Sequence, residues 1–125
     1  LPWGNGITNA RGLARVYAAL ASGGSIDGHR LVSAEALLPL RETQSWTKMD
    51  RVLRKPQGWT QGFVKEDEMM FSPNAESFGH PGAGGALGWC DPSEELAISY
   101  IPNKMAHHIR SPRARALAAA IYRCV

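Results

Sequence analysis

The 125-residue chain has 44% hydrophobic residues and a formal net charge of +3, which is the size and composition of one modest globular domain. No apolar run approaches the roughly 18 residues of a membrane-spanning helix, so no membrane association is expected. The densest basic cluster, from Lys104 to Arg115, lacks the interleaved aromatic residues and the reader motif typical of nucleic-acid-binding proteins. No nucleic-acid partner is expected either.

The cysteines and the amino terminus leave the localisation of the protein unknown. Cys90 and Cys124 are too few for a disulfide framework and form no Cys-x-x-Cys pair, so both are expected to be free and buried. The amino terminus has neither the basic start nor the apolar stretch of a signal peptide.

Residues 1–41 are predicted to form a helical segment. Asn9 is a suitable N-cap, and glycines 23 and 24 should end the helix that follows it. The apolar face of this helix is expected to consist of Leu13, Val16, Tyr17 and Leu20. Asp27-Gly28 predicts a tight turn between two short extended pieces. Ser33 should cap a second helix that ends or kinks at Pro39, because proline removes a donor and clashes one turn back.

Residues 42–57 are polar and their apolar residues show neither a helical nor a strand periodicity, so this range is interpreted as a long connection. Residues 58–125 are predicted to hold strands and a C-terminal helix. The range from Gly58 to Val64 has strand character, and the range from Lys65 to Asn74 is a charged turn region. Three short strands are then expected at 78–80, 86–90 and 96–101, the second buried on both faces.

The last helix is predicted to start at Pro112, capped by Ser111. Its apolar stripe is expected to consist of Ala114, Leu117, Ala118, Ile121, Tyr122 and Val125. The order of helices, strands and a final helix indicates an α+β fold, with an antiparallel sheet of three to four strands and flanking helices. The whole chain, 1–125, is treated as part of a single domain.

The segment from Phe78 to Gly88 is the most unusual stretch because it contains glycines at 82, 84, 85 and 88. Glycines weaken a strand unless a ligand or a second backbone must approach closely. A glycine-rich bend at the edge of a sheet is the alternative. A variant dinucleotide fingerprint is rejected because Asp91-Pro92 breaks the chain where the helix of a βαβ unit should begin.

Other chemistry receives little support. His107 and His108 are adjacent, so they point to different faces, and the carboxylates lack the spacing of metal ligands. No metal and no cofactor are expected. The chain contains no Gly-x-Ser-x-Gly, and no serine is recognised as the activated nucleophile of a serine hydrolase.

Three stretches together resemble the serine β-lactamase-like family, which includes class C β-lactamases, family VIII esterases and penicillin-binding-protein-like hydrolases. They are residues 4–15 with the glycine pair 23–24, residues 28–37, and residues 78–92, in which His80-Pro81-Gly82 takes the place of the family's third active-site box. Asn103-Lys104-Met105 is also similar to the esterase-like branch. The resemblance implies that this chain is the C-terminal part of a β-lactamase/transpeptidase-like fold.

The resemblance also implies roles for four residues. His80 would project into the cleft and polarise the substrate, and the backbone N–H of Ala83 would be one of two oxyanion donors. Gly82 and Gly84 would let an acyl group lie against the strand. The family's Lys-Thr-Gly box has a hydroxyl and an N–H that Pro81 lacks, which favours carboxyl esters or amides over β-lactams as the small-molecule substrate.

The family's nucleophile box and tyrosine box are not recognised in this sequence, so the isolated chain is expected to be an inactive portion of a serine hydrolase. Two alternatives remain: a catalytically inactive β-lactamase-like scaffold, and a ligand- or protein-interaction module. Because strands from elsewhere would complete the sheet, self-association of the isolated chain through unpaired strand edges is also expected.

Overall fold

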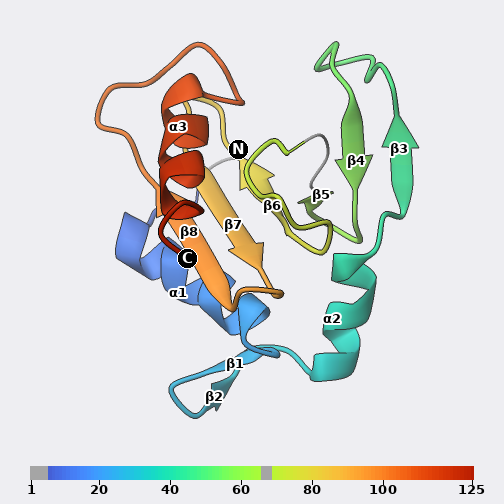
Figure 1. Ribbon diagram of the computed structural model, residues 1–125, viewed down its shortest axis with the longest axis vertical. Helices are drawn as coiled ribbons and strands as arrows, with labels where there is room; N and C mark the ends of the chain where they lie inside the picture. Colours follow the sequence, from blue (N-terminus) through green and yellow to red (C-terminus); the bar gives the residue numbers. More distant parts are fainter. Residues whose placement is uncertain (1–5, 66–68) are drawn as a thin grey trace.

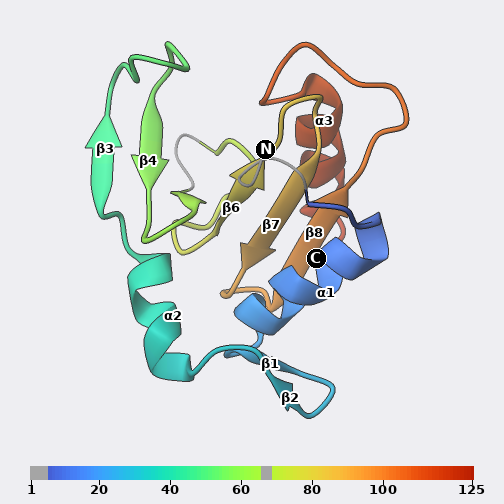
Figure 2. The ribbon, with the colours of Figure 1, turned by 180° about the vertical axis from the view of Figure 1, so that it is seen from behind.

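The computed structural model describes residues 6–65 and 69–125, and its centre is an antiparallel sheet with a helix on each face (Figures 1 and 2). In the described residues the sheet has six strands in the order β3-β4-β5-β6-β7-β8, and a separate two-stranded hairpin joins β1 to β2. The elements are α1 (Ala10–Ala21), β1 (Ser25–Ile26), β2 (His29–Arg30), α2 (Ala34–Arg41), β3 (Ser45–Thr47), β4 (Gln57–Trp59), β5 (Val64–Lys65), β6 (Phe78–Pro81), β7 (Leu87–Asp91), β8 (Leu96–Tyr100) and α3 (Pro112–Ile121).

Helix α1 begins and ends as predicted. The Asn9 side chain accepts a hydrogen bond from the Gly12 N–H at 2.9 Å, and Gly23 and Gly24 both have positive φ values directly after the helix. The buried face differs from the prediction, because Val16 is 47% exposed. The buried residues of the helix are Tyr17, Ala19, Leu20 and Ala21.

The predicted turn at Asp27-Gly28 is confirmed. Asp27 has φ +49° and Gly28 has φ +76°, and the turn joins β1 to β2 with Ile26 opposite His29. Two consecutive residues with positive φ are the geometry of the tight hairpin turns that favour Asp-Gly. An ion pair between Arg15 and Asp27 ties this hairpin to α1.

Helix α2 is capped by Ser33 as predicted, with the Ala36 N–H donating to the Ser33 Oγ at 3.2 Å. Of the two outcomes expected at Pro39, an end or a kink, the end does not occur, because the helix continues to Arg41. Leu37 is 1% exposed, and its burial in the core stabilises a short helix that local propensity alone would terminate.

The region between α2 and β6 differs most from the prediction. The supposed connection 42–57 contains β3, and the supposed single strand from Gly58 to Val64 is a hairpin of β4 and β5. The turn between these strands has a Thr60 N–H to Phe63 carbonyl bond of 2.9 Å and φ +109° at Gly62. The supposed turn region from Lys65 to Asn74 includes the end of β5. Its residues 66–68 lie outside the described residues.

The sheet separates two hydrophobic clusters. On the face covered by α3, Leu87, Trp89 and Ile98 pack with Ala114 and Ala118. On the face covered by α1 and α2, the cluster contains Tyr17, Leu20, Ala21, Leu37, Phe78 and Cys90. All five residues of β7 are buried, which confirms the prediction of a strand buried on both faces.

Helix α3 starts at Pro112 as predicted, but the Ser111 side chain makes no capping hydrogen bond. The apolar stripe is also narrower than predicted, because Leu117 is 38% exposed and Val125 is exposed as well. Cys124 is exposed near the end of the chain, so only Cys90 is the buried free cysteine that was expected. No described helix has the length and apolar character needed to cross a membrane.

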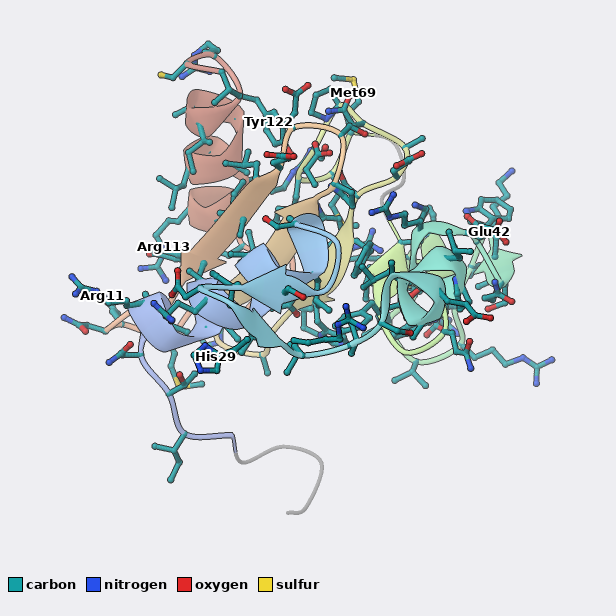
Figure 3. The ribbon with its side chains drawn as sticks, turned by 90° about the horizontal axis from the view of Figure 1, so that it is seen from below. Arg11, His29, Glu42, Met69, Arg113 and Tyr122 are labelled. Carbon is teal, nitrogen blue, oxygen red and sulfur yellow. The ribbon has the colours of Figure 1, made fainter. Side chains whose placement is uncertain are left out.

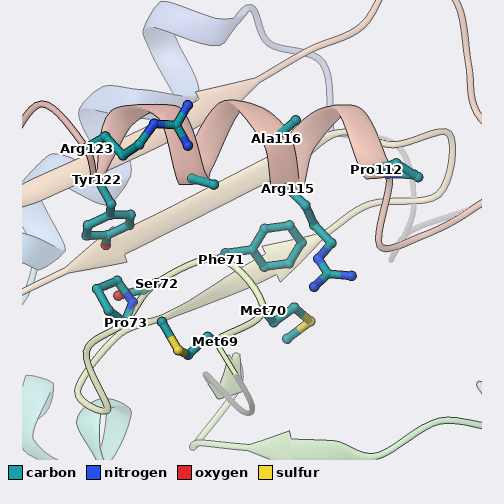
Figure 4. Close-up of a pocket in the computed structure, with 11 residues that line it drawn as sticks. Met69, Met70, Phe71, Ser72, Pro73, Pro112, Arg115, Ala116, Tyr122 and Arg123 are labelled. Carbon is teal, nitrogen blue, oxygen red and sulfur yellow. The ribbon is translucent and has the colours of Figure 1, made fainter.

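A buried carboxylate fastens α3 to the sheet. Asp91, at the end of β7, accepts hydrogen bonds from the Tyr122 hydroxyl at 2.6 Å, the Ser72 hydroxyl at 2.9 Å and the Asn74 amide at 2.8 Å. Figure 4 shows Tyr122 extending from α3 toward Ser72. The donors come from α3 and from the loop before β6, so one side chain holds three segments together.

The α+β class is confirmed, and the sheet has six strands where three to four were expected. The additional strands, β3 to β5, contain two or three residues each. In Figure 3, Glu42, next to this part of the sheet, lies on the opposite side of the molecule from Arg113 on α3.

Candidate active site

The predicted box lies at the end of β6, where the strand leaves the sheet. His80 is directly opposite Gly88 on β7, and Pro81 is opposite Leu87. The His80 side chain is exposed, and its ring centroid is 5.9 Å from that of Trp59. Its Nδ1 is 3.0 Å from the Pro81 carbonyl oxygen. Because a carbonyl only accepts, this contact favours the proton on Nδ1 and leaves Nε2 available to another group.

A tight turn follows the box and joins β6 to β7. The Gly82 N–H donates to the Ala86 carbonyl at 2.7 Å, and the Gly85 N–H donates to the Gly82 carbonyl at 3.1 Å. Ala83 lies exposed in this turn, and no described residue accepts a hydrogen bond from its N–H. The Ala83 N–H, directly after His80-Pro81-Gly82, is therefore a main-chain donor that no described residue of the chain engages.

Two of the glycines in this segment are required by the chain's own packing. A Cβ on Gly88 would lie 2.1 Å from the Cε2 of Tyr17, so the tyrosine ring lies on the strand where a side chain would otherwise stand. A Cβ on Gly85 would lie 3.0 Å from the Cβ of Ser111, and Gly85 has φ +94°. The glycine-rich bend that the sequence left open as an alternative accounts for these two positions.

Gly84 and Gly82 differ in their surroundings. Gly84 is buried, has φ +86° and faces the Met105 side chain, and its carbonyl accepts from the Ala106 N–H at 2.7 Å. Gly82 is less crowded, because the nearest atom to a Cβ there would be the Ala86 Cβ at 3.3 Å. Gly84 thus determines the shape of the turn and bonds it to the loop before α3. Gly82 has no side chain, so nothing projects from the chain at this position next to His80.

Two titratable groups next to the box stay protonated at neutral pH. Burial raises the pKa of Tyr17 well above its ordinary value, with a further contribution from Cys90, and a hydrogen bond from the His80 backbone opposes the rise only in part. Burial raises the pKa of the Cys90 thiol to about 12, and the nearby Asp91 carboxylate adds to the increase. Neither residue can therefore serve as a base or a nucleophile.

Two serines of the described chain take part in the buried hydrogen-bond network of Asp91. Ser72 and Ser77 are buried, and Ser77 donates a hydrogen bond to the Ser72 hydroxyl at 2.7 Å within the Asp91 network. No group of three histidine, cysteine or carboxylate side chains suited to a metal ion occurs in residues 6–65 and 69–125. His107 and His108 are exposed in the loop before α3.

A cavity of about 570 Å³ lies between α3 and the segment before β6, and it includes no residue of the β6–β7 turn (Figure 4). Phe71 lies under the helix at this cavity and packs against Trp89, with ring centroids 5.1 Å apart. The lining of the cavity is mostly apolar, with Arg115 and Arg123 on the helix side.

Sequence reasoning missed two neighbours of His80. Trp59 was assigned to a strand, but its contact with His80 depends on the β4–β5 hairpin, which has no local signal strong enough to reveal it. Tyr17 was predicted as part of an apolar helix face, and nothing in its spacing indicates that its ring covers Gly88.

The fold and the position of the box define an α+β protein with an antiparallel sheet flanked by helices, in which a glycine-rich turn follows an exposed histidine at the end of a strand. A family model described as Beta-lactamase matches residues 2–122. The esterase/β-lactamase LipL of Mycobacterium tuberculosis is 36% identical over 105 residues, which are 84% of this chain and 24% of that protein.

Solved structures agree with this match. A family VIII carboxylesterase superposes with a TM-score of 0.87 at 36% identity, covering 94% of this chain and 32% of that one. A penicillin-binding protein homologue from Caulobacter crescentus has a TM-score of 0.88 at 32% identity, with the same coverage. EstA from Arthrobacter nitroguajacolicus has a TM-score of 0.78 at 27% identity, covering 93% of this chain and 32% of EstA.

This chain belongs to the β-lactamase family, as the resemblance of its sequence predicted. It spans about a quarter of the length of the curated relative and about a third of the length of these solved structures.

Proposed function

We propose that this chain supplies the substrate side of a serine hydrolase that acts on carboxyl esters or amides. The observation that carries the proposal is the N–H of the exposed residue Ala83, which has no acceptor among the described residues and follows His80-Pro81-Gly82 at the end of β6. A fixed main-chain donor of this kind can stabilise the oxyanion of an acyl-transfer transition state, and removing one such donor costs about 3 kcal/mol.

His80 and the two glycines have distinct roles in this proposal. The exposed imidazole, steadied by the Pro81 carbonyl and the Trp59 ring, presents Nε2 to a polar group of the substrate. Gly82 leaves space for the acyl group along the strand, and Gly84 holds the turn that aims the Ala83 N–H.

Two observations support esters or amides over β-lactams. Pro81 has neither the hydroxyl nor the N–H that threonine provides in a Lys-Thr-Gly box. One similar solved structure is described as a family VIII carboxylesterase, whereas the description of the curated relative, esterase/β-lactamase, names both activities.

The Ser-x-x-Lys sequence of these 125 residues, Ser45-Trp46-Thr47-Lys48, begins in strand β3, where side chains three residues apart point to opposite faces. This sequence therefore does not pair its serine with its lysine, and the nucleophile is inferred to come from outside these 125 residues. We therefore propose that the chain is the C-terminal portion of a longer hydrolase and is inactive alone. A catalytically inactive scaffold, or an interaction module with the same fold, is the alternative, and it would lack an activated serine nucleophile in the complete protein as well.

The test compares the 125-residue chain with the complete protein on p-nitrophenyl butyrate and nitrocefin. The chain alone should show no turnover above background, and the complete protein should hydrolyse the ester and lose this activity to a serine-directed phosphonate. Turnover that co-purifies with the isolated chain and is abolished by the phosphonate would contradict the proposal. An inactive complete protein would favour the scaffold.

A further inference from the structure

A second, smaller groove lies between the loop that precedes β4 and the loop that precedes α3. Its volume is about 260 Å³. The residues that line it are Val52, Leu53, Lys55, His107, His108, Ile109 and Arg110. Neither loop contributes to the box that the proposed function uses.

The groove is connected to the candidate active site on both sides. On one side, the Ala106 N–H donates to the Gly84 carbonyl at 2.7 Å, and Ala106 directly precedes His107. On the other side, the Arg110 guanidinium donates to the Gln57 Oε1 at 2.9 Å. Gln57 lies at the start of β4, the strand that carries the tryptophan packed against His80. A substrate bound at the turn would thus have the groove beside it.

The walls of the groove are held by main-chain contacts as well as by side chains. Arg110 also donates to the Pro56 carbonyl at 2.7 Å, which joins the two loops directly. Asp50 accepts from the N–H groups of Val52 and Leu53 at 2.8 and 2.7 Å and so fixes the turn that carries both. The groove is therefore formed by two braced loops.

The lining is cationic and hydrogen-bond donating. Lys55 carries a full positive charge and is exposed, and the imidazoles of His107 and His108 each offer at least one N–H donor in either protonation state. Among the described residues, no aspartate or glutamate lines the groove. The nearest carboxylate along the chain, Asp50, has its Oδ1 engaged by two main-chain N–H groups. Valine, leucine and isoleucine side chains complete the groove. A ligand with an anionic group at the end of a short hydrocarbon chain would therefore match both the charge and the apolar part of the lining.

We propose that this groove binds a carboxylate carried by the substrate, so that the hydrolase prefers esters or amides with an anionic group a few carbons from the scissile bond. This inference rests on the proposed function of the β6–β7 turn. Lys55 and the two histidines are the specificity-determining residues, and Arg110 is the positioning residue that holds their loops together.

The test uses the complete protein and two matched esters, mono-p-nitrophenyl glutarate and its methyl ester, which differ in one negative charge. Wild type should favour the anionic ester in kcat/KM. Lys55→Glu should lower kcat/KM for the anionic ester by about tenfold or more and change the neutral ester by less than about twofold. Because exposed charges are screened by salt, the wild-type preference should also shrink as NaCl rises toward about 1 M.

The control is Arg30→Glu, which makes the same charge reversal at an exposed position on β2. Circular dichroism establishes that both variants fold. An equal response of the two esters to Lys55→Glu, or an equal effect of Arg30→Glu, overturns the carboxylate site.

Binding is measured independently of hydrolysis. The imidazole NMR signals of His107 and His108 are followed as glutarate or dimethyl glutarate is added. Shifts caused by glutarate alone, and abolished by Lys55→Glu, support the site even if neither ester is hydrolysed, in which case the proposed function fails by itself. Identical spectra with and without glutarate overturn the site.

Discussion

The ring of Tyr17 lies directly on the backbone of Gly88, the residue that pairs with His80 across β6 and β7. Helix α1 thereby contacts the sheet at the strand position opposite the candidate catalytic histidine. The contact is possible only because residue 88 has no side chain, since any Cβ there would lie 2.1 Å from the ring.

Gly88→Ala should destabilise the chain by about 1–3 kcal/mol, because the added methyl group must displace a buried aromatic ring. Urea unfolding followed by circular dichroism measures the change. Gly6→Ala is the matched control, since nothing lies within 4 Å of a Cβ at that glycine, and its effect should stay within about 0.5 kcal/mol. If the two substitutions have equal effects, Tyr17 does not constrain the strand.

The Asp91 network predicts a specific acid sensitivity. Burial raises the pKa of Asp91, but the hydrogen bonds from Tyr122, Asn74 and Ser72 outweigh it and leave the pKa below its ordinary value. A lowered folded-state pKa means that the stability it contributes is present above the unfolded value of about 4 and is lost as pH falls through the folded value.

Asp91→Asn should therefore lower the free energy of unfolding by about 1–3 kcal/mol at pH 7 and flatten its dependence on pH below about 4. Urea unfolding at a series of pH values measures both effects. Glu95→Gln, an exposed carboxylate in the following turn, is the control and should leave the acid limb unchanged. If the free energy of unfolding of Asp91→Asn depends on pH below about 4 as the wild type does, another carboxylate is responsible for the acid sensitivity.

The isolated chain should behave as an incomplete sheet. Strand β8 pairs only with β7 among the described residues, so its other edge presents unpaired N–H and C=O groups. We expect either a dimer that pairs such edges or a loosely packed monomer. Sedimentation velocity gives the mass, and hydrogen exchange over residues 78–90 reports the packing. A compact monomer with these residues strongly protected would contradict the expectation and favour the scaffold alternative.

The sequence predicted the elements whose signals are local. The Asn9 cap, the Asp27-Gly28 turn and the apolar run of β7 each depend on neighbouring residues, and all three were correct. Strand β3 was missed, and the hairpin of β4 and β5 was taken for one strand, because segments of two or three residues carry no periodicity and their pairing is determined by non-local contacts. Pro39 remained helical because the burial of Leu37 overrides its local effect.

The candidate site was found by its glycines and by the resemblance, and only part of its construction follows from sequence. The position of His80 at the end of a strand was predicted from the run that begins at Phe78. The packing that requires glycine at position 88 was not predicted. Tyr17 lies 71 residues before Gly88 in the chain, and their contact exists only in the folded protein.

The most direct test of the account is the kcat/KM of the complete protein for p-nitrophenyl butyrate with His80→Ala. We expect a decrease of about tenfold to a thousandfold, because the variant loses a polar contact next to the developing negative charge. His29→Ala, an exposed histidine on β2, is the control and should retain the wild-type rate. A folded His80→Ala variant with wild-type kcat/KM would show that the strand is structural and that the site assignment is wrong.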